Sequence, residues 1–354
     1  AYASLHINSS RDVMAYSDFP MPRDYPHFPH HSQILRYFES YVEHFGLRKH
    51  IRFRSSIESV RPREDGLFDV TVDDDGNRRD ELYSAVLVAN GHHWCPRHVS
   101  FPGTFGGTSY HSHEYESPKS LEGQRVLIVG IGNSGCDIAC DVSRVAEKTF
   151  LSTRRGAHII PKYIFGKPLD VISPRFFWTH LPFRVFQWIF GISLLLSRGK
   201  LRSYGVPVPP HRVLQEHPTV SSDLLNLVGH GRVMIKANVE TLTSNTVRFV
   251  DGTQEDIDVI IYATGYEIQF PFLESSIIHP QGNKVHLYHN VVHPKIHNLY
   301  FVGLVQPWGP IMPLAEMQSE WIGDLLEGTA CLPSTEEMEQ SIASEAARMA
   351  RRYT

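Results

Sequence analysis

Residues 125–139 constrain the fold of this chain most strongly, because they read as a strand, a glycine turn and a helix in immediate succession. The aliphatic run 126–129 leads into Gly130, Gly132 and Gly135, which have the spacing G-x-G-x-x-G. In that context the first glycine permits a tight turn, the second lets a pyrophosphate approach the backbone, and the third lets the helix pack on the strand. The motif therefore predicts a dinucleotide site at a helix N-terminus. A tight strand-to-helix turn without a ligand is the alternative.

The identity of the dinucleotide is predicted from the end of the next strand-like run, 148–152. An NAD site usually places Asp or Glu there to hold the ribose 2′-hydroxyl. Here Thr153, Arg154 and Arg155 follow, with no acid. Because a guanidinium can bind a phosphate through two hydrogen bonds, these residues favour NADP(H) over NAD(H). A solvated arginine pair in a surface loop is the alternative.

Composition narrows the remaining function classes. The 354 residues are 42% hydrophobic and 20% charged with a formal net charge of −4, which is typical of a soluble globular protein of about two domains. No basic run suggests a nucleic-acid partner. The four cysteines form no C-x-x-C pair, so we expect neither a zinc site nor disulfides, and a cytoplasmic location fits. The 21 histidines are scattered, and we expect no metal site.

The order of predicted elements indicates an α/β fold with a parallel-sheet core and a β-rich insertion. We expect a helix from Ser32 and a closing helix over 311–326. Asp73–Gly76 reads as a turn between strands, and Asp251 and Gly252 as a hairpin turn. The expected strands are 51–60, 67–72, 82–89, 126–129, 148–152, 232–235, 246–249, 257–262 and 299–303.

The aromatic segment 176–196 is long, but His180, Pro182, Arg184 and Gln187 interrupt it. A membrane-spanning helix needs about 20 predominantly apolar residues. We therefore expect an amphipathic helix that covers a core or lines a substrate channel. Contact with a membrane surface is the less favoured alternative.

Several motifs together resemble one family, the class B flavoprotein monooxygenases, and most strongly the flavin-containing (dimethylaniline) monooxygenases. The resemblance spans essentially the whole chain. It rests on Phe101-Pro102-Gly103, on Phe105-x-Gly107-x-x-x-His111-x-x-x-Tyr115, on the segment from Gly130 to Asp137, on Ala263-Thr264-Gly265-Tyr266, on the opening from Tyr2 to Asn8 and on to Pro20, and on the region from Gly303 to Trp321.

This resemblance implies two Rossmann-like dinucleotide-binding domains, with the NADPH domain inserted into the FAD domain. Residues 1–118 and 263–354 would form the FAD-binding domain, and 119–262 the NADPH-binding domain with an aromatic insertion at about 160–215. The family also has an earlier glycine motif for FAD, within a first β-α-β unit that this sequence lacks. We expect an N-terminally truncated piece of a longer protein rather than a family member that has dispensed with flavin.

The resemblance also implies a mechanism and a set of site residues. NADPH reduces FAD, O2 adds at flavin C4a to give a hydroperoxide, and an amine nitrogen or a sulfide attacks the distal oxygen. We expect Asn8 at the reacting centre, because an amide both donates and accepts hydrogen bonds. His111 is expected to brace the interdomain linker. The expected cofactor-binding residues are Ile7, Asn8, Ser9, Gly130, Gly132, Asn133, Ser134, Gly135, Cys136, Asp137, Thr153, Arg154, Arg155, Thr264, Gly265 and Gln318.

Three readings of the function stay open at this point. Tyr115 stands where Baeyer–Villiger monooxygenases of this class usually carry Trp, which favours oxygenation of small-molecule amines or sulfides, as in xenobiotic oxidation, over ketone insertion. A Baeyer–Villiger or N-hydroxylating monooxygenase is the second reading. A catalytically inactive nucleotide-binding fragment is the third. The physiological substrate is not predicted, and a homodimer is left open.

Overall fold

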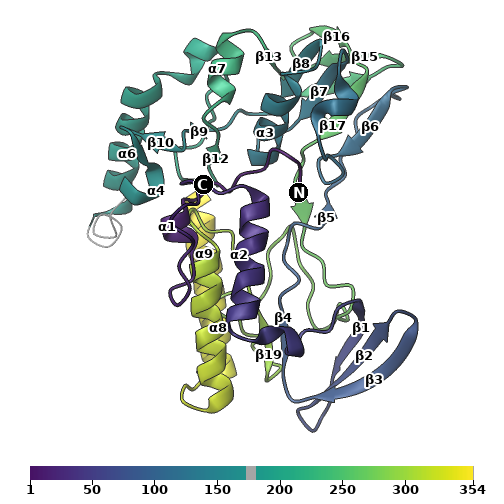
Figure 1. Ribbon diagram of the computed structural model, residues 1–354, viewed down its shortest axis with the longest axis vertical. Coiled ribbons are helices and arrows are strands. Elements are labelled where there is room, and N and C mark those ends of the chain that lie inside the picture. The colour runs from purple at the N-terminus through teal and green to yellow at the C-terminus, as the bar shows by residue number, and fades with distance from the viewer. Residues whose placement is uncertain (173–180, 354) are drawn as a thin grey trace. The chain divides into compact units, whose positions relative to one another are not determined.

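The computed structural model describes residues 1–172 and 181–353 (Figure 1). The chain forms two compact units, each assembled from several segments. The first unit contains Ala1–Val13, Pro22–Ile34 and Pro96–Gly265, and the second contains Met14–Met21, Leu35–Cys95 and Tyr266–Thr354.

A parallel sheet forms the centre of the first unit. Its strands are β13 (Val233–Lys236), β8 (Lys148–Ser152), β7 (Arg125–Val129), β17 (Val259–Tyr262) and β6 (Thr108–His111), paired in that order. The central strands β7 and β17 are nearly continuous aliphatic runs because both faces of the sheet are covered there, whereas the edge strand β6 is polar. The α/β class and the parallel core expected from the sequence are therefore confirmed.

The glycine motif folds as the sequence predicts, with β7 leading into helix α3 (Asn133–Val142) beside the sheet (Figure 1). Val126 and Ile128 pack with Ile138 of α3 in one core cluster. Leu127 faces the other way, into a cluster with Phe249. That second face is covered by an antiparallel sheet of β14 (Val239–Leu242), β15 (Thr246–Phe249) and β16 (Gln254–Asp256).

Short elements between β8 and β13 complete the first unit. They are β9 (Ile159–Ile160), β10 (Tyr163–Ile164), β11 (Lys167–Pro168), α4 (Leu169–Ile172), α6 (Phe183–Arg198), η3 (Leu201–Tyr204), β12 (Thr219–Val220) and α7 (Leu224–Gly229), with η2 (Pro118–Leu121) preceding β7.

Helix α6 only partly matches the expectation for segment 176–196, of which 176–180 lie outside the described residues. Phe186, Gln187 and Leu194 are buried. However, Trp188 is 68% and Leu196 73% exposed, so one face of the helix packs on the protein, as the expected amphipathic helix does, while another face presents large apolar side chains that the described residues leave uncovered. Among the residues that the structure describes, no helix is both long and apolar enough to cross a membrane.

The second unit contains a three-stranded antiparallel sheet, a parallel strand pair and long helices. The sheet is β1 (Ser55–Pro62), β2 (Phe68–Asp74) and β3 (Asn77–Tyr83), and the pair is β4 (Val86–Val88) with β19 (Leu299–Phe301). The helices are α2 (His31–His44), whose first residues belong to the first unit, α8 (Met312–Glu327) and α9 (Thr335–Tyr353), with the shorter elements η1 (Leu47–His50) and β18 (Tyr266–Glu267). Two short elements are divided between the units: α1 (Arg11–Met14), which lies in the first unit except for Met14, and β5 (Cys95–Pro96).

In this unit the structure corrects one sequence expectation and adds one helix that was not predicted. The single strand expected over 82–89 is the end of β3 followed by the separate strand β4. Helix α9 was not predicted, because its apolar residues are mostly alanines interspersed with Glu and Arg, and few large apolar side chains mark a buried face.

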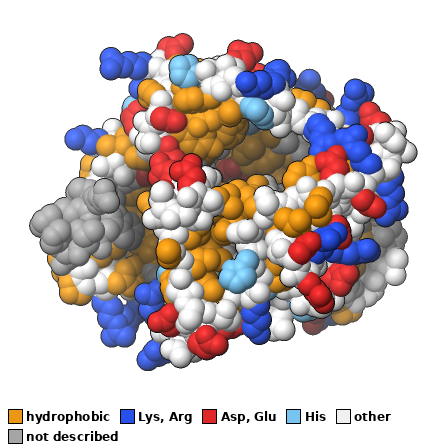
Figure 2. Space-filling view, turned by 90° about the horizontal axis from the view of Figure 1, so that it is seen from below, with side chains coloured by type: hydrophobic (Ala, Val, Ile, Leu, Met, Phe, Trp, Pro, Cys, Tyr) orange, Lys and Arg blue, Asp and Glu red, His pale blue; other side chains and the backbone are white. Residues whose placement is uncertain are grey.

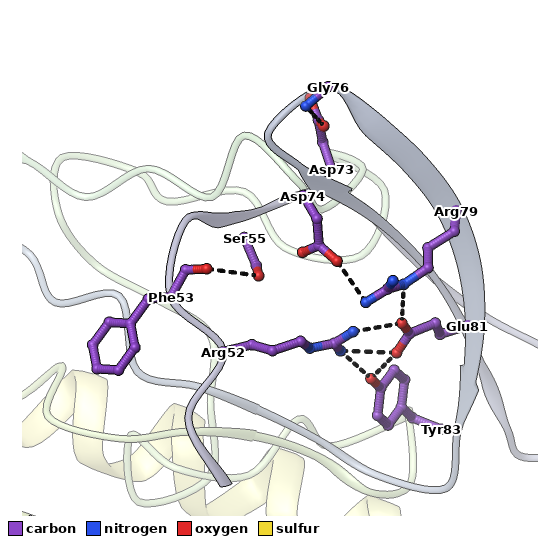
Figure 3. Close-up of polar contacts among 9 residues, drawn as sticks. All are labelled: Arg52, Phe53, Ser55, Asp73, Asp74, Gly76, Arg79, Glu81 and Tyr83. Atoms are coloured by element: carbon purple, nitrogen blue, oxygen red, sulfur yellow. Dashed lines mark hydrogen bonds and ion pairs between the residues drawn. The ribbon is translucent and has the colours of Figure 1, made fainter. Parts of the chain in front are cut away.

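Charged side chains join the edge of the antiparallel sheet (Figure 3). Nη1 and Nη2 of Arg52 donate to Glu81, at 2.6 and 2.9 Å, and Arg79 Nε donates to the same carboxylate at 2.6 Å. The Tyr83 hydroxyl also donates to Glu81. These donors hold the pKa of Glu81 well below its usual range. Because the group is solvent-exposed, it fixes local geometry more than it adds stability.

Candidate functional site

The three motif glycines occupy three different environments in the turn between β7 and α3. Gly130 has φ +116°, and a Cβ there would lie 2.4 Å from the carbonyl oxygen of Ala263. A Cβ on Gly135 would lie 1.9 Å from the Gly130 carbonyl oxygen. A Cβ on Gly132, by contrast, would meet nothing within 4 Å. Packing therefore requires the first and third glycines, whereas the second faces open space, as an approaching pyrophosphate needs.

A cavity of about 560 Å³ opens beside this turn, within the first unit. It lies where the parallel strands β7, β8 and β17 end, which is where ligands bind in open α/β sheets. The cavity brings together six of the predicted site residues: Gly130, Gly132, Thr153, Arg154, Arg155 and Thr264. The other ten predicted site residues do not line it.

The two arginines that follow β8 differ in their hydrogen-bond and ion-pair partners. Arg155 donates to Glu216 at 2.7 Å, so its charge is already paired. The exposed Arg154 side chain has no hydrogen bond or ion pair with any described residue. Thr153 is buried, and its Oγ1 accepts a hydrogen bond from the backbone N–H of Gly156 at 2.9 Å, which closes the turn. Of the two arginines, Arg154 is therefore the one whose charge is unpaired among the described residues.

Residues at the start of α3 are engaged within the protein. Asn133 Oδ1 accepts from the backbone N–H of Val220 at 2.7 Å, which fastens the helix start to β12. Cys136 is fully buried, and burial raises the pKa of its thiol well above the usual range. Both side chains thus support the turn, and any contact that they or Ser134 make with a cofactor stays a prediction.

Two aspartates of α3 hold the N-terminal segment. Tyr2 donates its hydroxyl to Asp137 at 2.8 Å, and Ser4 donates to Asp141 at 3.0 Å. The buried hydroxyl of Tyr115 also donates to Asp141, at 2.8 Å. Burial is the main cause that raises the pKa of Asp137, partly offset by the Tyr2 hydrogen bond. Helix α3 therefore links the glycine turn to the segment that contains Asn8.

The backbone on both sides of Asn8 is held by residues of the insertion. Lys162 Nζ donates to the carbonyl oxygen of Ile7 at 3.1 Å, and Asp170 accepts from the backbone N–H of Ser10 at 2.6 Å. Burial lowers the pKa of Lys162. Between these two anchors, the buried Asn8 Oδ1 has no hydrogen-bond partner in the protein.

A buried polar atom without a partner costs free energy unless a ligand supplies one. Asn8 is thus an acceptor, held by its neighbours, that a cofactor N–H or O–H can satisfy. The acceptor at Asn8 and the open space at Gly132 are compatible with a bound dinucleotide.

Sequence reasoning missed Lys162, Asp170 and Glu216. Lys162 and Asp170 lie 155 and 160 positions from the residues that they hold, so no local spacing or periodicity marks them. Nothing in the sequence around Glu216, apart from its charge, predicts its ion pair with Arg155. Within the described part of the chain, no His, Cys, Asp or Glu side chains converge as metal ligands would.

The remaining predicted residues have structural contacts of their own. Thr264 donates to the carbonyl oxygen of Arg97 at 2.6 Å, and Gly265 has φ +86°. His111 is buried, and its Nδ1 accepts from the backbone N–H of His113 at 3.1 Å. In the second unit, Gln318 is buried rather than on an exposed helix face, and its Oε1 accepts from the backbone N–H of Gly303 at 2.9 Å. Flavin contact by Gln318 stays a prediction.

Comparison with known proteins identifies the family. The family model for flavin-binding monooxygenase-like proteins matches residues 1–354. The chain belongs to this family. The enzyme is 40% identical to flavin-containing monooxygenase 5 of Oryctolagus cuniculus, over 99% of this chain and 68% of the rabbit protein. It is 38% identical to dimethylaniline monooxygenase (N-oxide-forming) 2 of Rattus norvegicus, over 97% of this chain and 66% of that protein.

Solved structures agree on the fold. S-allyl-L-cysteine S-oxygenase from Allium sativum is 26% identical, with a TM-score of 0.73 over 99% of this chain and 68% of that one. Cyclohexanone monooxygenase from Rhodococcus sp. Phi1, bound to NADP⁺, is 18% identical with a TM-score of 0.71, over 99% and 81% of the two chains, and shows likeness of fold alone. The enzyme is therefore a flavin-dependent monooxygenase of the two-dinucleotide-domain class, with FAD and NADP(H) as cofactors and a small molecule and O2 as substrates.

Proposed function

We propose that this enzyme transfers one oxygen atom from O2 to a nucleophilic nitrogen or sulfur of a small molecule, at the expense of NADPH. The observation that carries the proposal is the buried, unpartnered Oδ1 of Asn8, held in place through the backbone of its neighbours Ile7 and Ser10. Bound FAD would supply the transfer of electrons from NADPH to O2 and the activation of oxygen.

The roles of the chain's own residues follow from their positions. Asn8 offers its amide to the cofactors and orients them. Gly132 leaves space for the pyrophosphate of NADPH, and Arg154 binds its 2′-phosphate through the free guanidinium. Residues 119–262 supply this NADPH site, and we assign 1–118 with 263–354 to FAD.

The names of related proteins support nitrogen or sulfur as the oxygen acceptor. One relative forms N-oxides of dimethylaniline, and a structural neighbour at 26% identity oxygenates the sulfur of S-allyl-L-cysteine. The Tyr115 hydroxyl is engaged with Asp141, so this position stabilises α3 and is a weaker guide to substrate than the sequence suggested.

Product analysis tests the proposal. The purified enzyme, yellow and with flavin absorbance, would be given NADPH, O2 and either a dialkyl sulfide, a tertiary amine or a cyclic ketone. We expect a sulfoxide and an N-oxide, with little lactone. Lactone as the main product would indicate Baeyer–Villiger oxidation instead, and a colourless protein that binds NADPH without turnover would indicate a nucleotide-binding fragment.

A further inference from the structure

A second cavity in the first unit, of about 920 Å³, lies along α6. Its lining differs from that of the cavity beside the glycine turn. Its lining is mainly apolar, and Trp188, Ile192 and Leu195 of α6 face Val208 and Val213 across it. Those three α6 side chains are 68%, 37% and 47% exposed, so the described residues leave them partly uncovered. A volume of this size matches sites for small organic ligands.

The Lys and Arg side chains that line this cavity give it a positive charge. Residues 171–215 contain no Asp or Glu, although the whole chain has a formal net charge of −4. The same stretch carries six cationic residues: Arg175, Arg184, Arg198, Lys200, Arg202 and Arg212. Of these, all but Arg175, which lies outside the described residues, line the cavity.

Arg198 has the most informative position. It lies at the end of α6, and its Nε is buried without a hydrogen-bond partner. Its Nη1 donates to the carbonyl oxygen of Gly199 at 3.2 Å. Arginine does not lose its charge in proteins, so a half-buried guanidinium without a carboxylate is costly until an anion arrives.

Gly191 keeps the cavity open from the middle of α6. A Cβ there would meet only Val213 Cγ1, at 4.0 Å, so packing does not require glycine. Glycine in a helix interior costs roughly 0.5–1 kcal/mol relative to alanine. A larger side chain at this position would point toward the space between α6 and Val213.

We propose that this cavity binds a single-chain anionic amphiphile, specifically a long-chain carboxylate, with its head at Arg198 and its apolar tail along α6. Figure 2 shows that hydrophobic side chains and Lys and Arg side chains lie next to one another on one face of the molecule. A bilayer surface is the less favoured occupant, because the buried Nε of Arg198 is withdrawn from a flat contact.

Titration calorimetry on the flavin-loaded enzyme tests the proposal, using dodecanoate below its micelle concentration, dodecanol and dodecyltrimethylammonium. We expect dodecanoate to bind at least tenfold more tightly than the cationic probe. Arg198→Met should weaken dodecanoate at least tenfold and leave dodecanol unchanged, whereas Arg198→Lys should retain most of the affinity. Arg232→Met, at an exposed position away from the cavity, is the matched control.

Gly191→Phe provides an independent arm, because it should fill the cavity and weaken both dodecanoate and dodecanol without changing the unfolding temperature greatly. Equal binding of the anionic and cationic probes, or full dodecanoate affinity in both Arg198→Met and Gly191→Phe, would overturn the proposal. Binding to phosphatidylglycerol vesicles without binding of monomeric dodecanoate would overturn it in favour of a membrane surface.

Discussion

Replacing Lys162 with methionine should uncouple NADPH oxidation from substrate oxygenation. The ammonium of Lys162 donates to the carbonyl oxygen of Ile7 at 3.1 Å and lies 5.0 Å from the Phe28 ring centroid. Methionine keeps most of the apolar stem but removes the donor. The peptide group preceding Asn8 then loses its anchor, while Asp170 still holds the peptide group of Ser10.

The magnitude follows from the type of bond that is lost. A hydrogen bond to a charged group contributes about 1.5–3 kcal/mol. If that free energy is lost from the reacting geometry, product formation falls by roughly 10- to 100-fold. A misplacement of about 1 Å at a reacting centre has a cost of similar size.

The assay compares NADPH consumed, oxygenated product and hydrogen peroxide in the same reaction. We expect the variant to consume NADPH and release peroxide in place of product, with little change in the Kd for NADPH. Lys162→Arg should restore most of the coupling because it restores a donor. The matched control is Lys167→Met, an exposed lysine of the same insertion. Full coupling in a correctly folded Lys162→Met enzyme would refute the reasoning.

Other predictions address the glycine turn, the phosphate site and pH. Gly135→Ala should destabilise the fold by about 1–3 kcal/mol in thermal unfolding, since the added Cβ meets a backbone oxygen. Gly132→Ala should fold normally but weaken NADPH binding more than about tenfold, because its Cβ would enter the open space. Equal unfolding temperatures for the two variants would contradict this. Arg154→Ala should reduce the preference for NADPH over NADH more than about tenfold, and Arg155→Ala much less because Glu216 already pairs with it; the reverse order in steady-state kinetics would move the phosphate site. Burial raises the pKa of Asp137 in the folded protein, so ionisation of this carboxyl favours unfolding, and its contribution to stability falls as pH rises from about 4 through the folded pKa. Asp137→Asn should therefore raise the unfolding temperature at pH 7 but not at pH 4. An equal effect at both pH values would argue against a raised pKa.

The parts of the fold that the sequence predicts are those specified by local pattern. Strand 148–152 and the strand–turn–helix from Arg125 were placed correctly, because an aliphatic run followed by spaced glycines has few other solutions. Glycine identity at Gly130 and Gly135 follows from the close backbone approach seen in the structure.

The parts that were not predicted depend on contacts between distant segments. The anchors of Asn8 come from Lys162 and Asp170, and neither stands in a recognisable motif. The sequence predicts that Arg154 and Arg155 both belong to one phosphate site, but Glu216 forms an ion pair with Arg155 and leaves only Arg154 unpaired of the two. Side-chain pairing of this kind is decided by tertiary packing, which periodicity does not encode.

The yield of oxygenated product per NADPH in the Asn8→Ala enzyme shows whether Asn8 lies at the reacting centre. We expect the variant to bind NADPH still, because the glycine turn and Arg154 are untouched, but to release hydrogen peroxide in place of most of the sulfoxide or N-oxide. An Asn8→Ala enzyme that gives the native yield of product per NADPH would contradict the assignment of Asn8 to the reacting centre.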